Sequence, residues 1–382
     1  MSDSRVRVAI DYRPALFSRS GISRSVRELV RALSQCSQDS ELVLFAHAWK
    51  RALDPNWREG LAETVHVARS RLPGRVQPWL ARLGLDARRL AKGADIFHIT
   101  DFVQPPLGRS ARVVMTVHDL AFHADPRFHG ASQSLRLARR LERLLRHDPL
   151  LVFPSRASRD AFVAQYGTKQ RLQVIPFGSD HARRQGTDPE RGRRLAQRLL
   201  GSEEPFVLCL GTIEPRKNHD VLLHAHETLA ERGRPLPLLV VGAPGWECDA
   251  VQHRLARGQE RFPLHWASTL EDADCFDLLA AARVLAYPSS LEGFGFPPLE
   301  GLELGTPCVV GDCPALREQL GEAACFVPPR DHESLAEQLL RCYSREELRR
   351  EQLAAWEARH KQRSWQRCAE RYLEAYREAA SD

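Results

Sequence analysis

The sequence lacks several features that would place it in familiar classes. Its nine cysteines occur singly, with no C-x-x-C pair, and some lie in apolar segments such as Val207–Leu210. This pattern is typical of buried free thiols in a reducing compartment and disfavours a disulfide framework or a structural zinc site. No G-x-G-x-x-G follows the first predicted strand, so a dinucleotide-dependent oxidoreductase is the weakest alternative.

The chain also lacks the apolar segments of exported or membrane-spanning proteins. No apolar h-region follows the basic residues near the N-terminus, and no apolar run approaches the roughly 18 residues of a membrane span. We therefore expect a cytoplasmic protein, attached at most peripherally to the inner face of a membrane.

What the sequence does contain is enough material for two globular domains. Its 382 residues exceed the roughly 150 of one average domain, and 43% are hydrophobic while 27% are charged. The net charge of +6 is mild and comes mostly from arginine. Composition alone therefore indicates no class of partner.

Apolar runs alternate with helical patterns through the first half. The predicted strands are Arg5–Asp11, Glu41–Ala46, Ala94–Ile99, Arg112–Val117, Leu150–Phe153 and Val174–Pro176. This alternation predicts a parallel, doubly wound α/β sheet, in which ligands bind beyond the carboxyl ends of the strands. Polar residues follow these strand ends at Asp101, His118, Asp119 and Ser155. A His-Asp pair is often structural, but this position favours a functional role for His118 and leaves Asp119 open.

A loop near the start carries Gly21 and Ile22, between the first strand and a helical pattern beginning near Val26. A strand, a glycine-bearing loop and a helix N-terminus can cradle a phosphate, because free N–H groups and the helix dipole point there. One glycine is equally what an ordinary βα turn needs, so both interpretations remain.

Two stretches, Arg69–Lys92 and Leu135–Arg146, are rich in arginine with interspersed leucine. They are either solvated faces of surface helices or a surface for anionic lipid headgroups. Nucleic acid is disfavoured, because no aromatic platform or known binding module accompanies the charge.

The second half repeats the strand and helix alternation. A polar segment, Gly178–Gly201, is expected to connect the domains. The strands predicted after it are Phe206–Leu210, Leu236–Gly242, Pro263–Trp266, Val284–Tyr287, Cys308–Val310 and Ala324–Pro328. They predict a second Rossmann-like domain, followed by helices from Asp331 onward.

The most informative stretch is Tyr287–Val310. Its strand, glycine- and proline-rich turn and helix N-terminus form a cradle for an anion. Glu292 and Glu300 flank this cradle, and we expect them to bind hydroxyls because carboxylates are poor partners for phosphate. Upstream, Arg216 and Lys217 occupy another strand-to-helix loop and supply the planar fork and the point charge that suit a diphosphate. Together these groups indicate a sugar-nucleotide site.

These motifs resemble those of the retaining glycosyltransferases of family 4. Glu292 and Glu300 match the E-x7-E motif of that family, and G-T-I-E-P-R-K-N at 211–218 and G-T-P at 305–307 are similar to its sequences. The first half matches more loosely, through Gly21-Ile22, T-V-H-D at 116–119 and P-S at 154–155. The resemblance implies the GT-B fold, with Rossmann-like acceptor and donor domains at 1–180 and 181–362 facing across a cleft. The C-terminal helix, 363–382, would return to the first domain.

The resemblance also implies roles for individual residues. Arg216 and Lys217 would neutralise the departing diphosphate, while Glu292 would bind the donor sugar and Glu300 the ribose. His118 would line the sugar and acceptor site, and the catalytic set would be His118, Arg216, Lys217 and Glu292. The implied donor-binding residues are Gly21, Ile22, Gly211, Thr212, Arg216, Lys217, Glu292, Gly293, Phe294, Gly295, Phe296, Pro297, Leu299 and Glu300. The implied acceptor side consists of Asp101, His118, Asp119 and Ser155.

Within the family, the chain resembles bacterial mannosyltransferase-like enzymes of polysaccharide and lipopolysaccharide assembly. This implies GDP-mannose as donor and a glycan or lipid-linked acceptor. No D-x-D stretch is placed to hold a metal, so we expect no cofactor, with Arg216 and Lys217 replacing the cation and anomeric configuration retained without a protein nucleophile. The alternatives are another enzyme on the same fold (a UDP-sugar transferase, epimerase or phosphorylase) and a non-catalytic sugar-nucleotide-binding protein.

Overall fold

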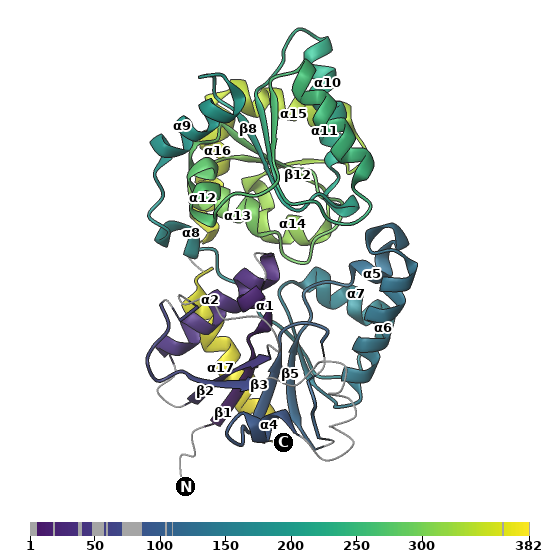
Figure 1. Ribbon diagram of the computed structural model, residues 1–382, viewed down its shortest axis with the longest axis vertical. Coiled ribbons are helices and arrows are strands. Elements are labelled where there is room, and N and C mark those ends of the chain that lie inside the picture. Colours follow the sequence, from purple (N-terminus) through teal and green to yellow (C-terminus); the bar gives the residue numbers. More distant parts are fainter. Residues whose placement is uncertain are drawn as a thin grey trace. The chain divides into compact units, whose positions relative to one another are not determined.

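The computed structural model describes residues 6–17, 20–36, 40–47, 57–58, 60–70, 86–103, 105–108, 110–360 and 363–381 (Figure 1). The chain divides into two compact units. The first unit comprises Met1–Ala124, Gly130–Gly178 and Arg363–Asp382, and the second unit comprises Asp125–His129 and Ser179–Gln362. Each is an α/β domain built on a parallel sheet, which confirms the predicted fold class.

The first unit is built on a 7-stranded sheet in the order β3-β2-β1-β4-β5-β6-β7. Its strands are β1 (Val6–Asp11), β2 (Ser40–His47), β3 (His66–Ser70), β4 (Ile96–Ile99), β5 (Arg112–Thr116), β6 (Leu150–Phe153) and β7 (Leu172–Val174). Its helices are α1 (Arg13–Phe17), α2 (Gly21–Cys36), α4 (Ala87–Leu90), α5 (Ala121–Ala124), α6 (Ala131–Leu145), α7 (Arg156–Tyr166) and α17 (Trp365–Ser381). Strands β4 and β6 are buried along their whole length, as expected for a parallel sheet covered on both faces.

The last helix, α17, belongs to the first unit, although its sequence follows the whole of the second (Figure 1). A buried chain of hydrogen bonds joins it to the sheet. Tyr376 Oη lies 2.8 Å from His98 Nδ1, His98 Nε2 lies 2.8 Å from Thr116 Oγ1, and Thr116 Oγ1 lies 2.8 Å from Tyr372 Oη. Burial lowers the pKa of His98 to about 3, so the ring is neutral and needs one donor and one acceptor, which the hydroxyls supply.

The second unit is built on a 6-stranded sheet in the order β10-β9-β8-β11-β12-β13. Its strands are β8 (Val207–Leu210), β9 (Leu238–Val241), β10 (Leu264–Ala267), β11 (Val284–Tyr287), β12 (Cys308–Gly311) and β13 (Cys325–Val327). Its helices are α8 (His181–Arg184), α9 (Pro189–Leu200), α10 (His219–Glu231), α11 (Asp249–Arg261), α12 (Asp272–Ala281), α13 (Phe296–Glu303), α14 (Pro314–Leu320), α15 (His332–Ser344) and α16 (Glu346–His360). Single turns of 3-10 helix are η1 (Pro126–Phe128), η2 (Pro215–Lys217) and η3 (Gly321–Ala323). Every strand predicted for this half is present.

Most of Gly178–Gly201, expected to be a polar connection, is helical. Helix α9 starts at the N-cap Asp188, whose carboxylate accepts from two backbone N–H groups of the first turn. It packs closely on α12 because Gly192 has no side chain: a Cβ there would lie 2.1 Å from the carbonyl oxygen of Asp277. The boundary between the two units, at Gly178 and Ser179, lies at the start of the segment in which the connection was expected.

Two further expectations differ from the structure in the first unit. Strand β3 was not predicted, because its sequence, His66–Ser70, is largely polar and is ordered by pairing with β2. Gly21 and Ile22, expected in a loop, form the first turn of α2. Residues 71–85 of the first arginine-rich stretch lie outside the described residues.

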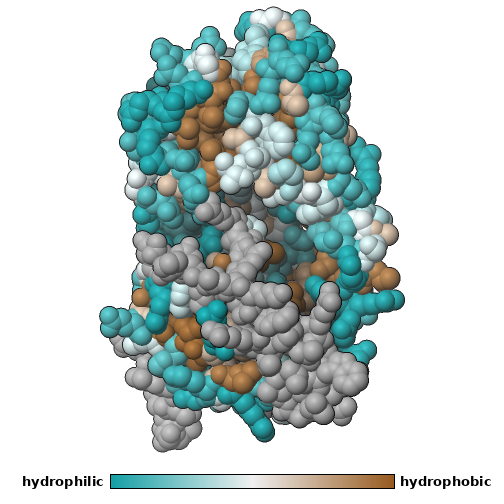
Figure 2. Space-filling model, viewed as in Figure 1, coloured by the Kyte–Doolittle hydropathy of each residue, from teal (hydrophilic) through white to brown (hydrophobic). Residues whose placement is uncertain are grey.

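Hydrophilic residues cover most of the described surface visible in Figure 2. Among the described residues, no helix combines the length and the apolar character needed to cross a bilayer. All nine cysteines are free thiols.

Replacing Tyr376 by phenylalanine removes the hydroxyl that meets His98 and leaves a buried ring nitrogen without its partner. We expect the free energy that opens α17 to fall by roughly 1–3 kcal/mol. Denaturant-dependent hydrogen exchange of the α17 amides measures this change. Tyr343→Phe removes a hydroxyl bonded to the carbonyl oxygen of Pro205 in the second unit, so it should leave α17 exchange unchanged. An equal effect of both variants would contradict the role of the His98 contact.

Candidate functional site

In the second unit, two loops meet beyond the carboxyl ends of adjacent strands. Strand β8 leads into η2, which carries Arg216 and Lys217, and its neighbour β11 leads into the loop that carries Glu292. Because β8 and β11 pair in parallel, their following loops emerge at the same edge of the sheet. The backbone carbonyl of Arg216 accepts hydrogen bonds from both the N–H and the hydroxyl of Ser290, so the loops are also joined directly.

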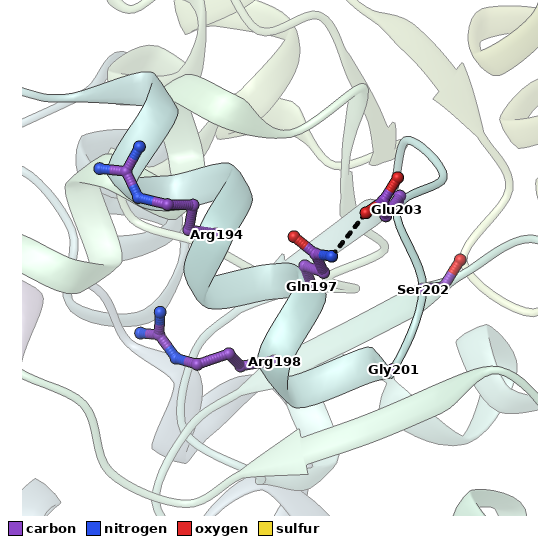
Figure 3. Close-up of a pocket in the computed structure, with 6 residues that line it drawn as sticks. All are labelled: Arg194, Gln197, Arg198, Gly201, Ser202 and Glu203. Carbon is purple, nitrogen blue, oxygen red and sulfur yellow. Dashed lines mark hydrogen bonds between the residues drawn. The ribbon is translucent and has the colours of Figure 1, made fainter.

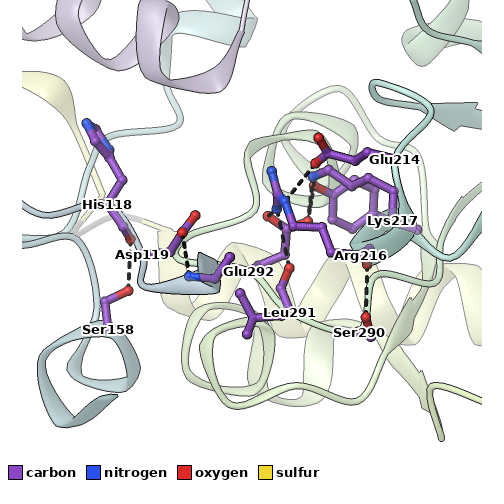
Figure 4. A network of polar contacts seen from close by, with 11 residues as sticks. His118, Asp119, Ser158, Glu214, Arg216, Lys217, Ser290, Leu291 and Glu292 are labelled. Atoms are coloured by element: carbon purple, nitrogen blue, oxygen red, sulfur yellow. Dashed lines mark hydrogen bonds and ion pairs between the residues drawn. The ribbon is translucent and has the colours of Figure 1, made fainter. Parts of the chain in front are cut away.

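Glu292 is the centre of the polar network at this edge (Figure 4). Its Oε1 atom lies 2.5 Å from Lys217 Nζ, and its Oε2 atom lies 3.1 Å from Arg216 Nη1. Arg216 Nε also lies 2.6 Å from Oε1 of Glu214. The sequence prediction that Arg216, Lys217 and Glu292 gather at one place agrees with these distances.

Tyr287, the last residue of β11, completes the network. Its hydroxyl accepts a hydrogen bond from Lys217 Nζ at 2.6 Å and donates one to Glu292 Oε1 at 2.8 Å. The Lys217 ammonium also lies 4.8 Å from the centre of the Tyr287 ring, within cation–π range. The tyrosine therefore fixes the position of both charged groups.

The buried charges shift one another's proton affinities. Burial would raise the pKa of Glu292, but the charges of Lys217 and Arg216 and the hydrogen bonds from Lys217 and Tyr287 lower it to about 2. Burial lowers the pKa of Lys217, with Glu292 opposing this effect. Burial and the charge of Glu292 raise the pKa of Tyr287 well above its ordinary value. The neutral tyrosine hydroxyl can therefore donate to a carboxylate and accept from an ammonium at pH 7.

The backbone after Glu292 turns sharply into α13. Gly295, the N-cap, has φ of 87°, and a Cβ at this position would lie 2.4 Å from Leu316 Cδ2. Phe294 and Phe296 on either side contact each other with ring centres 5.0 Å apart. Glycine at 295 thus allows the loop to reach the start of α13 and leaves that helix N-terminus at the same edge as Lys217.

The remaining predicted donor residues have varied surroundings. Gly211 is half-buried and Thr212 is exposed at the end of β8, whereas Leu299 is fully buried in the core. Pro297 lies in the first turn of α13 and has no N–H to donate. Glu300 is 1% exposed, and its Oε1 atom lies 2.8 Å from His181 Nε2 on α8. Binding of ribose by Glu300 stays a prediction, and this structure pairs the carboxylate with a histidine.

In the first unit, the structure brings together His118 and Ser155 through Ser158, and Figure 4 shows the contact between His118 and Ser158. The Ser158 hydroxyl donates to the carbonyl oxygen of His118 at 2.9 Å, and Ser155 caps α7 by accepting from Ser158 N–H at 3.1 Å. His118 Nε2 lies 3.0 Å from the carbonyl oxygen of Thr100, and burial lowers the pKa of its ring.

The other predicted residues of the first unit are held locally. Asp119 accepts from Ala121 N–H at 3.0 Å at the start of α5, and Asp101 pairs with Arg13 at 3.0 Å. Gly21 and Ile22 are exposed on the first turn of α2. Within the part of this unit that the structure describes, no hydrogen bond or ion pair joins these four residues to one another.

A pocket of about 640 Å³ lies elsewhere, at the end of α9 (Figure 3). It is lined by Arg194, Gln197, Arg198, Gly201, Ser202 and Glu203. None of the predicted site residues lines it. Over the described ranges, no three His, Cys, Asp or Glu side chains are grouped so that they could hold a metal ion.

Sequence reasoning missed Tyr287, Glu214 and His181. Tyr287 and Glu214 lie close in the sequence to Glu292 and Arg216, and this proximity could have indicated that they belong to the same site. His181 lies 119 positions from Glu300, and no local pattern indicates such a contact.

Comparison with known proteins gives a consistent assignment for both halves. Residues 19–183 match the family described as Glycosyltransferase Family 4, and residues 192–357 match Glycosyl transferases group 1. The chain is 28% identical over 381 residues to O-antigen chain mannosyltransferase B of Escherichia coli, covering 95% of this chain and 97% of that protein.

Two other relatives are more distant or partial. A GDP-mannose-dependent alpha-(1-6)-phosphatidylinositol monomannoside mannosyltransferase of Mycolicibacterium smegmatis is 28% identical over 183 residues, which cover 45% of this chain and 46% of that protein. The structure of Anabaena HepE in complex with UDP and glucose is similar in fold, with a TM-score of 0.71 and 20% identity over 98% of this chain and 100% of that one.

Replacing Tyr287 by phenylalanine removes only the hydroxyl that accepts from Lys217. We expect the pKa of Lys217 to fall further below its ordinary value, because the ammonium form loses one of its hydrogen-bond acceptors. An NMR titration of the protein with isotopically labelled methylated lysines measures this pKa, and Lys217→Arg identifies the resonance. Tyr343→Phe is the matched loss of a hydroxyl outside the network. A Lys217 pKa that is unchanged or higher in Tyr287→Phe contradicts the prediction.

Proposed function

The chain belongs to glycosyltransferase family 4 and has the GT-B fold, and from this premise we propose that it transfers mannose from GDP-mannose to a glycan or lipid-linked acceptor. The reaction would serve the assembly of a bacterial polysaccharide or lipopolysaccharide. The mannosyltransferase names of the relatives support this sugar, and the name of the M. smegmatis relative supports GDP as the base. HepE binds UDP and glucose, so a UDP-sugar is the alternative donor.

The observation that carries the proposal is the network of Arg216, Lys217 and Glu292. A lysine ammonium has three donors, and within the described residues the structure assigns two of them, to Glu292 and Tyr287. The third is available for an oxygen of the diphosphate. As the glycosidic bond breaks, negative charge grows on that diphosphate, and fixed cations lower the barrier by stabilising it. The proposal needs no metal ion, because the two side chains supply the positive charge.

The state of Glu292 supports transfer without a covalent sugar on the enzyme. Both of its oxygens face cationic donors, and its pKa of about 2 makes it a weak base and a weak nucleophile. We propose instead that the acceptor hydroxyl attacks on the face that the diphosphate leaves, with a phosphate oxygen accepting the proton. The anomeric configuration is then retained. A sugar trapped covalently on Glu292 would contradict this mechanism.

The arrangement also separates this activity from glycoside hydrolysis. Hydrolysis uses two carboxyl groups across the scissile bond. Here Glu300 is bound to His181, and Glu292 is committed to Lys217 and Arg216. His118, with its half-buried ring in the first unit, is proposed to line the sugar and acceptor site.

We further propose that α6 contacts an anionic membrane surface. Arg136, Arg139, Arg140 and Arg143 are exposed and recur at the spacing of one helical face, and Leu135 beside them is 52% exposed. Anionic headgroups attract such a face at about 1 kcal/mol per basic residue.

With GDP-mannose in a chelator-containing buffer, we expect the protein to transfer labelled mannose to a lipid-linked glycan acceptor. Lys217→Ala should reduce kcat/KM by roughly 10²–10³-fold, because one fixed cation at the developing charge is lost. Lys169→Ala removes an exposed lysine and should leave the rate unchanged.

Several outcomes would overturn this proposal. Transfer from UDP-sugars but not from GDP-mannose would contradict the proposed donor. Loss of transfer in the chelator would contradict the metal-free mechanism. Full activity in both Lys217→Ala and Glu292→Ala would show that the network is not catalytic. Binding of GDP-mannose without any transfer would favour a binding protein.

Replacing Arg136, Arg139 and Arg143 by glutamine should weaken binding to vesicles of anionic phospholipid by about 100-fold, since three basic contacts are lost. Sedimentation with vesicles measures the change. The triple variant at Arg193, Arg194 and Arg198 of α9 removes the same charge from another helix and is the control. Equal loss in both variants would show that net charge, rather than α6, attracts the membrane.

A further inference from the structure

Three thiols gather at one edge of the second sheet. Cys308 begins β12, Cys325 begins the edge strand β13, and Cys342 lies on α15. The Sγ atoms of Cys325 and Cys342 are 3.5 Å apart. This contact brings together two thiols that are 17 positions apart in the chain. They do not belong to the polar network around Glu292.

A buried glutamine orients this thiol pair. The Oε1 atom of Gln352, on α16, accepts the backbone N–H of Cys308 at 2.8 Å. That bond fixes which end of the amide is the oxygen, so the amide N–H groups point to the sulfur atoms, 3.2 Å from Cys325 Sγ and 3.7 Å from Cys342 Sγ. Donors aimed at a sulfur atom stabilise its thiolate.

The two thiols differ in charge and access. The hydrogen bond from Cys342 lowers the pKa of Cys325 to about 7 against the effect of burial, and the Gln352 amide and the Arg341 charge add to this. The same hydrogen bond and burial raise the pKa of Cys342. Cys325 is half-buried, whereas Cys342 is 1% exposed. Cys325 is therefore the more exposed residue of the pair and the one whose thiolate form is favoured.

We propose that Cys325 and Cys342 form a reversible redox-modification site, whose oxidant is a low-molecular-weight disulfide. A reactive, accessible thiolate beside a second thiol is the arrangement that such sites require. Cys325 is the attacking group and Cys342 is the resolving group.

The exchange balances in two steps. The Cys325 thiolate attacks one sulfur of the small disulfide, forms a mixed disulfide and releases one small thiolate. Cys342 then attacks Cys325 Sγ, its proton passes to the departing thiolate, and the second small thiol leaves. The protein loses two thiols, and the small disulfide is reduced to two thiols. Closing the Sγ atoms from 3.5 Å to bonding distance needs a movement of about 1.5 Å.

The test uses the full-length protein in buffers of reduced and oxidised glutathione, followed by alkylation of the remaining thiols and peptide mass mapping. We expect two of the nine thiols to disappear, with a cross-link between Cys325 and Cys342 that dithiothreitol reverses. Cys342→Ser should stop at a glutathione adduct on Cys325, and Cys325→Ser should give no adduct at Cys342.

Cys36→Ser is the control, because Cys36 is half-buried in the first unit, and the burial and the nearby Glu370 charge raise its pKa. This variant should form the same cross-link as the original protein. As the pH increases, the alkylation rate of Cys325 should rise near pH 7. The rate for Cys36 should rise only at a higher pH. A cross-link between other cysteines, a glutathione adduct that persists on Cys325 while Cys342 is intact, or an unreactive Cys325 beside a modified Cys36 would each overturn the proposal.

Discussion

The rest of the site depends on the ion pairs that the buried carboxylate of Glu292 makes. This carboxylate joins the loop after β8 to the loop after β11 through Lys217 and Arg216. Removing one member of a buried ion pair leaves an uncompensated charge, which costs several kcal/mol, so each charge requires the others. Arg216 is balanced in turn by Glu214. Two cations and two acids leave the network with little net charge, although it contains strong donors. Under the proposed function, directed hydrogen bonds rather than bulk attraction would hold the diphosphate at this site.

The choice of cation at this centre is also informative. Arginine supplies many of the surface ion pairs in the described part of the chain, such as Arg232–Glu333 and Arg183–Glu357. At Glu292 the shorter contact is made by lysine, a compact charge whose donors can turn toward different acceptors. Tyr287 limits that freedom, since its hydroxyl and ring both contact the ammonium. The site thus combines a rigid guanidinium with a lysine that keeps one direction open.

Much of this architecture could be predicted from local patterns. The buried strands are short apolar runs bounded by glycine and proline. Residues that come directly after a strand in the sequence lie at the carboxyl edge of the sheet. Arg216, Lys217 and Glu292 were found for that reason. Contacts between distant segments could not be found in this way. His181 meets Glu300 only because α8 packs beside α13, Gly192 matters only because Asp277 lies against it, and β3 exists only through its pairing with β2. Each depends on the folded arrangement, which a single sequence does not display.

The helix α17 has a consequence for the order in which the protein is made. Tyr376 and His98, hydrogen-bonded in the first unit, are 278 positions apart, and the whole of the second unit is synthesised between them. Until α17 emerges from the ribosome, Thr116 and the His98 ring have no tyrosine partners, and the face of the sheet that α17 covers is open. The second unit, whose residues are nearly contiguous, can close during synthesis. The unit that begins first is therefore completed last, and the sheet face that α17 covers stays open while the second unit is synthesised.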